Sequence, residues 1–84
     1  MSEKSIIIYA TDWCSDCIRS RNFLLKHAVV FTWIDIDKDQ EGARYVVEAN
    51  QGMRSVPTIL FEDGSILVEP TNAELGEKLG ISDA

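Results

Sequence analysis

Residues 11–20 read TDWCSDCIRS and contain the only two cysteines, Cys14 and Cys17, of an 84-residue chain. The run before this stretch, Ile6–Ala10, is rich in β-branched and aromatic residues, which is typical of a short strand buried on both faces. From Ser15 to about His27 the pattern becomes helical. The stretch therefore marks a turn from a strand into a helix, and this turn sets the frame for the rest of the fold.

An apolar stripe on this first helix is predicted to face the core. Its members are Cys17, Ile18, Leu24, Leu25 and Ala28, while Arg19, Ser20 and Lys26 lie away from the stripe and Phe23 lies off it. We expect Phe23 either to pack against another element or to be partly exposed.

The remaining chain predicts two more helices and three more strands. A second strand covers 31–36, and Asp37 and Asp39 offer N-caps for a helix that runs to about Asn50 and stops at Gly52. A hairpin follows, with strands at 58–62 and 65–68 around an Asp-Gly turn. Thr71 and Glu74 have the spacing of a capping box for a last helix that stops at Gly80.

The predicted order is β-α-β-α-β-β-α, an α/β fold in a single domain spanning residues 1–84. A strand, a crossover helix and a second strand form a right-handed parallel unit, to which the hairpin adds antiparallel strands. The expected result is a four-stranded mixed sheet flanked by three helices.

Composition argues against several kinds of partner. The net charge is −6 and the eight basic residues are scattered, so neither nucleic acid nor an anionic membrane is expected as a partner. No apolar run approaches the roughly 20 residues that span a bilayer. Met1–Lys4 lacks signal-peptide anatomy, so we expect a cytoplasmic location. We also expect a monomer.

Three interpretations compete for Cys14 and Cys17. A structural zinc site needs four protein ligands, but the chain offers two thiols and one histidine, His27, so no metal is expected. Inert burial suits Cys17 on the inner stripe but not Cys14, which precedes the first full helical turn. A redox pair accounts for both positions. A structural disulfide is not favoured, because structural disulfides are uncommon in the cytoplasm.

In the redox interpretation the two cysteines have different roles. Cys14 lies where unpaired backbone N–H groups and the positive end of the helix favour a thiolate, the form that acts as a nucleophile. Cys17 is one turn deeper, within reach of the Cys14 sulfur, and resolves a mixed disulfide. A C-x-x-C motif in a β-α-β pattern is a fairly specific sign of this chemistry.

Two motifs together resemble a known family. Trp13-Cys14-Ser15-Asp16-Cys17 resembles the active site of thioredoxin-fold oxidoreductases, and Ser55-Val56-Pro57-Thr58 resembles the Thr-Val-Pro segment of glutaredoxins. The compact length also favours glutaredoxins, and FEDGSILVEPTNAEL at 61–75 looks closest to the mycoredoxin-like glutaredoxins of bacteria. The resemblance covers the whole chain and implies a thioredoxin-like (glutaredoxin) fold and a thiol-disulfide oxidoreductase.

The resemblance also implies a set of site residues beyond the cysteines. It makes the Val56–Pro57 bond cis, with the Val56 backbone turned toward an incoming thiol and Ser55 beside it. It makes Trp13 a partly exposed contact for a partner, and it places Thr11 where glutaredoxins commonly carry a thiol-binding lysine. The usual Gly-Gly and Asp-Asp before the last helix are absent as well. Glutathione, mycothiol, bacillithiol and a protein disulfide all remain open as partners.

Asp16, between the cysteines, is expected to modulate the ionisation of Cys14. A nearby negative charge disfavours a thiolate and so opposes the effect of the helix end. Asp16 is equally explained as an acid in the first turn that favours the helix itself.

Two alternative functions remain open. One is a thioredoxin-like carrier that is reduced directly by a flavoprotein reductase. The other is a dimeric iron–sulfur protein, which some glutaredoxins resemble by holding a cluster between two nucleophilic cysteines and two thiol cofactors. No feature of the sequence specifically indicates iron binding.

Overall fold

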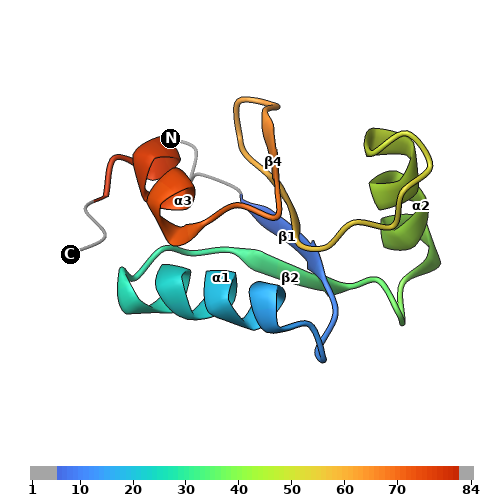
Figure 1. Cartoon of the computed structure of the whole chain (residues 1–84), viewed down its shortest axis with the longest axis horizontal. Helices are drawn as coiled ribbons and strands as arrows, with labels where there is room; N and C mark the ends of the chain where they lie inside the picture. Colours follow the sequence, from blue (N-terminus) through green and yellow to red (C-terminus); the bar gives the residue numbers. More distant parts are fainter. Residues whose placement is uncertain (1–5, 82–84) are drawn as a thin grey trace.

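The computed structural model describes residues 6–81, which form a mixed β-sheet with three helices (Figure 1). The elements, in chain order, are β1 (Ile7–Ala10), α1 (Ser15–Lys26), β2 (Thr32–Asp35), α2 (Gln40–Ala49), β3 (Thr58–Leu60), β4 (Ile66–Val68) and α3 (Asn72–Leu79). This order confirms the predicted fold class. The segment Met1–Lys4, in which we predicted no signal peptide, lies outside the described residues.

The strand order β2-β1-β3-β4 places the turn after β1 next to the loop before β3. β1 runs parallel to β2, with Tyr9 opposite Ile34, and antiparallel to β3, with Tyr9 opposite Thr58. β3 and β4 form the predicted antiparallel hairpin. The ends of β1 and β2 and the start of β3 therefore meet at one edge of the sheet, where the two sequence motifs converge.

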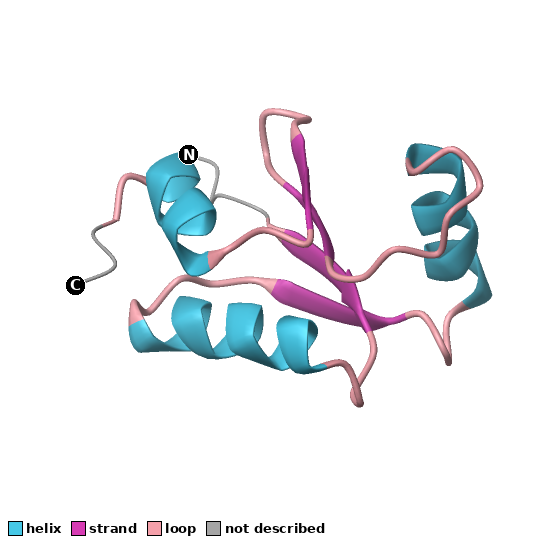
Figure 2. Ribbon diagram, in the orientation of Figure 1, coloured by secondary structure: helices cyan, strands magenta, loops and turns pink. Residues whose placement is uncertain are grey.

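The helices cover both faces of the sheet, as Figure 2 shows. α1 and α3 contact each other, and their buried residues Leu24 and Leu75 belong to the same core cluster as Ile8 and Ile59 of the sheet. α2 lies on the other face, where Val46 packs with Tyr9 and Ile36. Side chains alternate across a strand, so neighbouring residues Ile8 and Tyr9 serve different clusters.

The predicted stripe on α1 is wrong at Leu25, at Ser20 and at Ala28, which is exposed and lies after the end of the helix. Leu25 is 60% exposed, whereas Ser20 is fully buried and Phe23 is 4% exposed. Phe23 faces α3, where a Cβ added to Gly76 would lie 3.3 Å from its ring. α1 packs against a helix as well as the sheet, so its buried arc is turned toward Phe23 and Ser20 and away from Leu25.

Helix caps and turns follow the predictions closely. Thr71 and Glu74 form the capping box of α3, and Gly80 ends that helix in the left-handed region at φ 72°. Asp39 caps α2 by accepting a hydrogen bond from the Gly42 N–H. Asp37, the other predicted cap, does not serve α2 and has a different role at the site.

Candidate active site

Cys14 occupies the N-cap of α1, at the edge of the sheet where β1 ends. Its backbone is extended (φ −87°, ψ 120°), and its Sγ accepts a hydrogen bond from the Cys17 N–H at 3.3 Å. The first N–H groups of a helix have no partner within the helix, so a sulfur at the cap receives both a hydrogen bond and the positive end of the helix dipole. The Cys14 sulfur is therefore held at the positive end of α1, in contact with a backbone N–H of its first turn.

Cys17 lies one turn further along α1 and is fully buried. Burial first, then the hydrogen bond and charge of Cys14 and the charge of Asp16, together raise the pKa of the Cys17 thiol to about 12, against a backbone hydrogen bond with Thr11 that lowers it. Cys17 therefore keeps its proton at neutral pH. The two thiols, both free, have opposite environments although only two residues separate them.

The loop before β3 supplies the facing wall of the site. The Val56–Pro57 bond is cis. The Cys14 Sγ–H points to the Val56 carbonyl oxygen at 3.9 Å, so the two motifs 42 residues apart in sequence meet here. The Ser55 carbonyl accepts a hydrogen bond from the Thr58 hydroxyl at 2.8 Å, which ties the loop to the start of β3.

Trp13 is the most exposed of the predicted site residues, at 72%. Its indole Nε1–H donates to Asp37 Oδ2 at 2.8 Å, and the Arg54 guanidinium donates to Asp37 Oδ1 at 2.7 Å. Arg54 also reaches the Ile36 carbonyl at 3.4 Å. These contacts join the turn after β1, the end of β2 and the loop before Pro57.

The sequence analysis missed the role of Asp37, although one signal was available. Asp37 directly follows the second predicted strand and Trp13 follows the first, and parallel strands end at the same edge of a sheet. That placement predicts proximity, but which side chain faces which depends on the loops.

Asp16 and Arg19 form an ion pair at 2.8 Å on α1, the helix that Cys14 caps, with both side chains almost half exposed. Arg19 also donates to the carbonyl of Pro70, the residue two before α3, at 3.0 Å. This arginine ties α1 to the loop that leads into α3. The negative charge of Asp16 is thus partly balanced by a neighbour on its own helix.

Thr11 is not part of the surface around Cys14. Its side chain is fully buried, and its Oγ1 has no hydrogen-bond partner among the described residues. The short threonine side chain packs inward. The contact between Thr11 and a thiol stays a prediction, and the burial of this side chain disfavours it.

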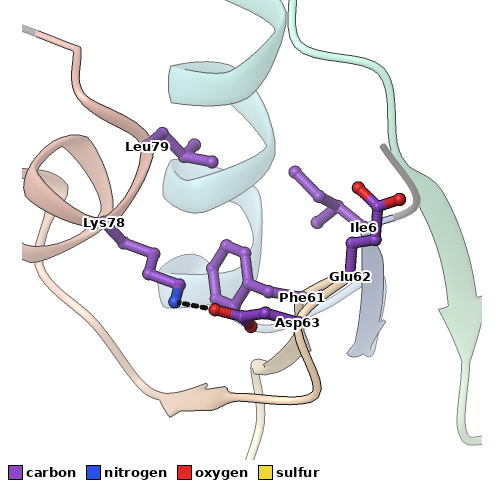
Figure 3. A pocket seen from close by; sticks show the side chains of 6 residues that line it. All are labelled: Ile6, Phe61, Glu62, Asp63, Lys78 and Leu79. Carbon is purple, nitrogen blue, oxygen red and sulfur yellow. Dashed lines mark hydrogen bonds and ion pairs between the residues drawn. The ribbon is translucent and has the colours of Figure 1, made fainter. Parts of the chain in front are cut away.

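Two hollows lie at different distances from the cysteines. A pocket of about 280 Å³ is formed by Ile6, Phe61 and Leu79 with the Lys78–Asp63 ion pair, at the end of the strands remote from Cys14 (Figure 3). A shallower groove between α1 and α3 starts beside Cys14, at Ser15. Its other lining residues are Ile18, Arg19, Asn22, Phe23, Lys26 and Asn72. The first pocket therefore stands apart from the thiol chemistry.

The described residues 6–81 contain neither a cluster of metal-ligating side chains nor a membrane-spanning helix. Within this range no three histidine, cysteine or acidic side chains gather in a way that would hold a metal ion. Within the same range no helix is long and apolar enough to cross a membrane.

Comparison with known proteins places this arrangement in a family. A family model described as Glutaredoxin matches residues 6–66. A protein of Mycobacterium tuberculosis with a glutaredoxin name is 35% identical over 79 residues, 94% of each chain. Mycoredoxin 1 of Corynebacterium glutamicum is 40% identical over 77 residues, 89% of this chain and 92% of that one.

Solved structures agree with the sequence matches. A glutaredoxin from Archaeoglobus fulgidus superimposes with a TM-score of 0.72 at 26% identity, over 88% of this chain and 84% of that one. A mutant of a thioredoxin-like protein reaches a TM-score of 0.81 at 25% identity, over 92% and 96%. The fold is thus thioredoxin-like, and the family is one of thiol-disulfide oxidoreductases. The chain belongs to the glutaredoxin family.

Proposed function

We propose that the chain reduces disulfides and mixed disulfides, with Cys14 as the nucleophile and Cys17 as the resolving cysteine. One observation carries the proposal: the Cys14 sulfur caps α1 and faces the Val56 carbonyl, while Cys17 is buried behind it. A thiolate at a helix N-terminus is the reactive form of cysteine.

The first step is an exchange at the surface. The Cys14 thiolate attacks one sulfur of a disulfide R–S–S–R′, a Cys14–S bond forms, and the S–S bond breaks. The thiolate R′–S⁻ leaves and takes a proton from solvent. The Val56 carbonyl lies beside the reacting sulfur, and we expect the Val56 backbone, Trp13 and Ser55 to contact the bound group.

The second step uses the buried thiol. Once Cys14 is bonded to R–S, it carries no charge, so one cause of the raised pKa of Cys17 disappears and the thiol loses its proton more easily. The Cys17 thiolate attacks the Cys14 sulfur, R–S⁻ leaves, and a Cys14–Cys17 disulfide remains. Two electrons have then passed from the dithiol to the substrate.

Regeneration requires a reductant. We propose a low-molecular-weight thiol as co-substrate in the cytoplasm, and the similarity to mycoredoxin 1 supports mycothiol as the first to test, before glutathione and bacillithiol. A thioredoxin-type reductase is the alternative reductant. No metal enters either step.

The test uses two cysteine variants and one small disulfide. Cys14→Ser is expected to abolish reduction of bis(2-hydroxyethyl) disulfide, because it removes the nucleophile. Cys17→Ser is expected to retain reduction of mixed disulfides when a thiol is supplied and to lose reactions that need both thiols. Activity in Cys14→Ser would overturn the assignment of the nucleophile.

The reductant is identified with the oxidised protein. It is offered mycothiol, glutathione, bacillithiol and a thioredoxin-type reductase in parallel, and free thiols are counted after each incubation. Reduction by a thiol supports the proposed cycle, whereas reduction by the flavoprotein alone replaces it with a thioredoxin-like carrier.

A further inference from the structure

Within residues 6–81, Asp37 is the one carboxylate that contacts both Trp13 and Arg54 at the edge of the candidate site. Its two oxygens are divided between them: Oδ2 accepts from the indole at 2.8 Å and Oδ1 from the guanidinium at 2.7 Å. Both residues lie close in sequence to reacting groups, since Trp13 precedes Cys14 and Arg54 lies two residues before Val56. Asp37 therefore fixes a side chain on each wall.

The same carboxylate decides what charge the site presents. Arg54 remains 45% exposed, but its charge is balanced by Asp37, which is 38% exposed. On α1, Arg19 is balanced by Asp16 in the same way. Each arginine that flanks the cysteines is thus paired within the chain, and neither is left as an unbalanced cation for a ligand carboxylate.

We propose that Asp37 is a specificity-determining residue, which neutralises Arg54 and holds Trp13 so that the site disfavours disulfides whose thiols carry carboxylates. The proposal rests on the proposed function and names the substrate class of that site: uncharged or cationic disulfides. Charged groups at the rim of a site act chiefly on encounter and on partner choice, and like charges disfavour association.

The ionisation of Asp37 is consistent with this role. The hydrogen bond from Arg54, then that from Trp13, holds the pKa of the Asp37 carboxyl below its usual range. The carboxylate is thus charged throughout the pH range in which thiol exchange is measured, and Arg54 stays balanced in that range.

The experiment separates the charge of Asp37 from its hydrogen bond to Trp13. Asp37→Asn keeps an amide oxygen that accepts from the indole but loses the charge that balances Arg54. The fully reduced protein reacts with three symmetrical disulfides: bis(2-hydroxyethyl) disulfide, oxidised glutathione and cystamine, which are neutral, anionic and cationic. Symmetry removes any ambiguity about which sulfur is attacked. Second-order rate constants are measured at low and at high salt.

The readout is the rate constant for each charged disulfide divided by that for the neutral one. In Asp37→Asn the ratio for oxidised glutathione is expected to rise about threefold at low salt, and the ratio for cystamine to fall, as the size of an exposed ion pair allows. High salt is expected to shrink both changes because it screens the charges. A ratio for glutathione that stays the same or falls would overturn the proposal.

Two further variants test whether Arg54 is responsible. In Asp37→Asn with Arg54→Gln, the gain for oxidised glutathione is expected to disappear; a gain that persists contradicts a role for Arg54. Asp63→Asn is the matched control, because it makes the same charge change at the Lys78–Asp63 ion pair (Figure 3), which lies at the opposite end of the strands from Cys14. Its rate ratios are expected to equal those of the unaltered protein. A rise in the glutathione ratio like that of Asp37→Asn would show that the change comes from net charge alone and would overturn the role of Asp37.

Failure of this proposal is distinguishable from failure of the proposed function. If Cys14 is not the nucleophile, Cys14→Ser still reacts with the disulfides. If only the specificity proposal fails, Cys14→Ser is inactive while Asp37→Asn leaves the ratios unchanged.

Discussion

The two cysteines show how far one helical turn separates two identical residues. Cys14 receives the unpaired N–H groups at the start of α1, whereas Cys17 points into the core and is fully buried. A helix exposes its cap and buries its inner face, so the C-x-x spacing places one sulfur in each environment. The roles in our proposal follow from position on the helix rather than from any difference in chemistry.

The raised pKa of Cys17 predicts selective alkylation. Below a pKa of about 12 the Cys17 thiol is mostly protonated, and it gains reactivity only as the pH rises toward that value. Iodoacetamide at pH 8 is therefore expected to modify Cys14 and to spare Cys17 in the reduced native protein. Peptide mass spectrometry measures the occupancy of each residue. Equal modification of both would contradict the buried, protonated thiol, and modification in denaturant serves as the reference.

Asp16 and Arg19 predict opposite effects on the reactivity of Cys14. Asp16→Asn removes a negative charge near the thiolate and is expected to speed alkylation of Cys14, whereas Arg19→Gln leaves Asp16 unbalanced and is expected to slow it. Because both side chains are almost half exposed and solvent screens them, each change is expected to be about twofold. Initial alkylation rates are compared at one pH and ionic strength. Changes of the same sign in both variants would rule out an effect of Asp16 charge.

At the scale of elements, α1 shows where a sequence pattern stops being sufficient. The spacing of the apolar residues correctly predicts the helix, but this spacing does not determine how much of the helix surface is buried. Contact with α3 widens it to include Phe23 and Ser20 and leaves Leu25 in solvent. The caps at Thr71 and Gly80 were predictable because they depend on local backbone chemistry alone.

Neighbouring leucines on α1 give a matched test of this arrangement. Leu24 is fully buried, so Leu24→Ala is expected to lower the free energy of unfolding by about 2–5 kcal/mol. Leu25 is 60% exposed, so Leu25→Ala is expected to change that free energy by less than about 0.5 kcal/mol. Urea denaturation followed by circular dichroism measures both. A similar loss of unfolding free energy in the two variants would indicate that Leu25 is buried, as the sequence pattern predicted.

The site was predictable to the extent that it follows from strand order. The parallel β1–β2 unit and the antiparallel hairpin were expected from the pattern, but the pairing of β3 with β1, which brings the two motifs together, was not. The cis bond at Pro57 came from resemblance, because an isolated X-Pro pair favours trans. The inward turn of Thr11 and the double contact of Asp37 depend on loop geometry, which the periodicity of the sequence does not encode.

At the scale of the molecule, one sheet divides the core into two clusters. The larger lies under α1 and α3, and the smaller lies under α2. Tyr9 and Ile8, adjacent on β1, each belong to a different cluster, so the central strand joins them. Active-site residues are supplied from the loops at one edge, while the sheet beneath them is held from both faces.

The distribution of surface groups predicts a monomer. Large exposed apolar side chains are spread over different elements and loops, namely Trp13, Leu25, Val30, Met53 and Val68. The net charge of −6 adds mutual repulsion between copies. Sedimentation velocity at micromolar concentration is expected to give a mass near the 9.4 kDa of one chain. A mass of twice that value, in the reduced protein without metal, would contradict the prediction.

The exposed indole of Trp13 gives the chain a built-in optical probe. Its ring is in solvent, its nitrogen is held by Asp37, and the residue that follows it carries the reacting sulfur. Indole fluorescence is sensitive to nearby sulfur and to the local field, so emission from Trp13 will change as Cys14 passes between thiolate and disulfide. With Trp33 replaced by phenylalanine, the redox state of the protein becomes readable in real time without a dye.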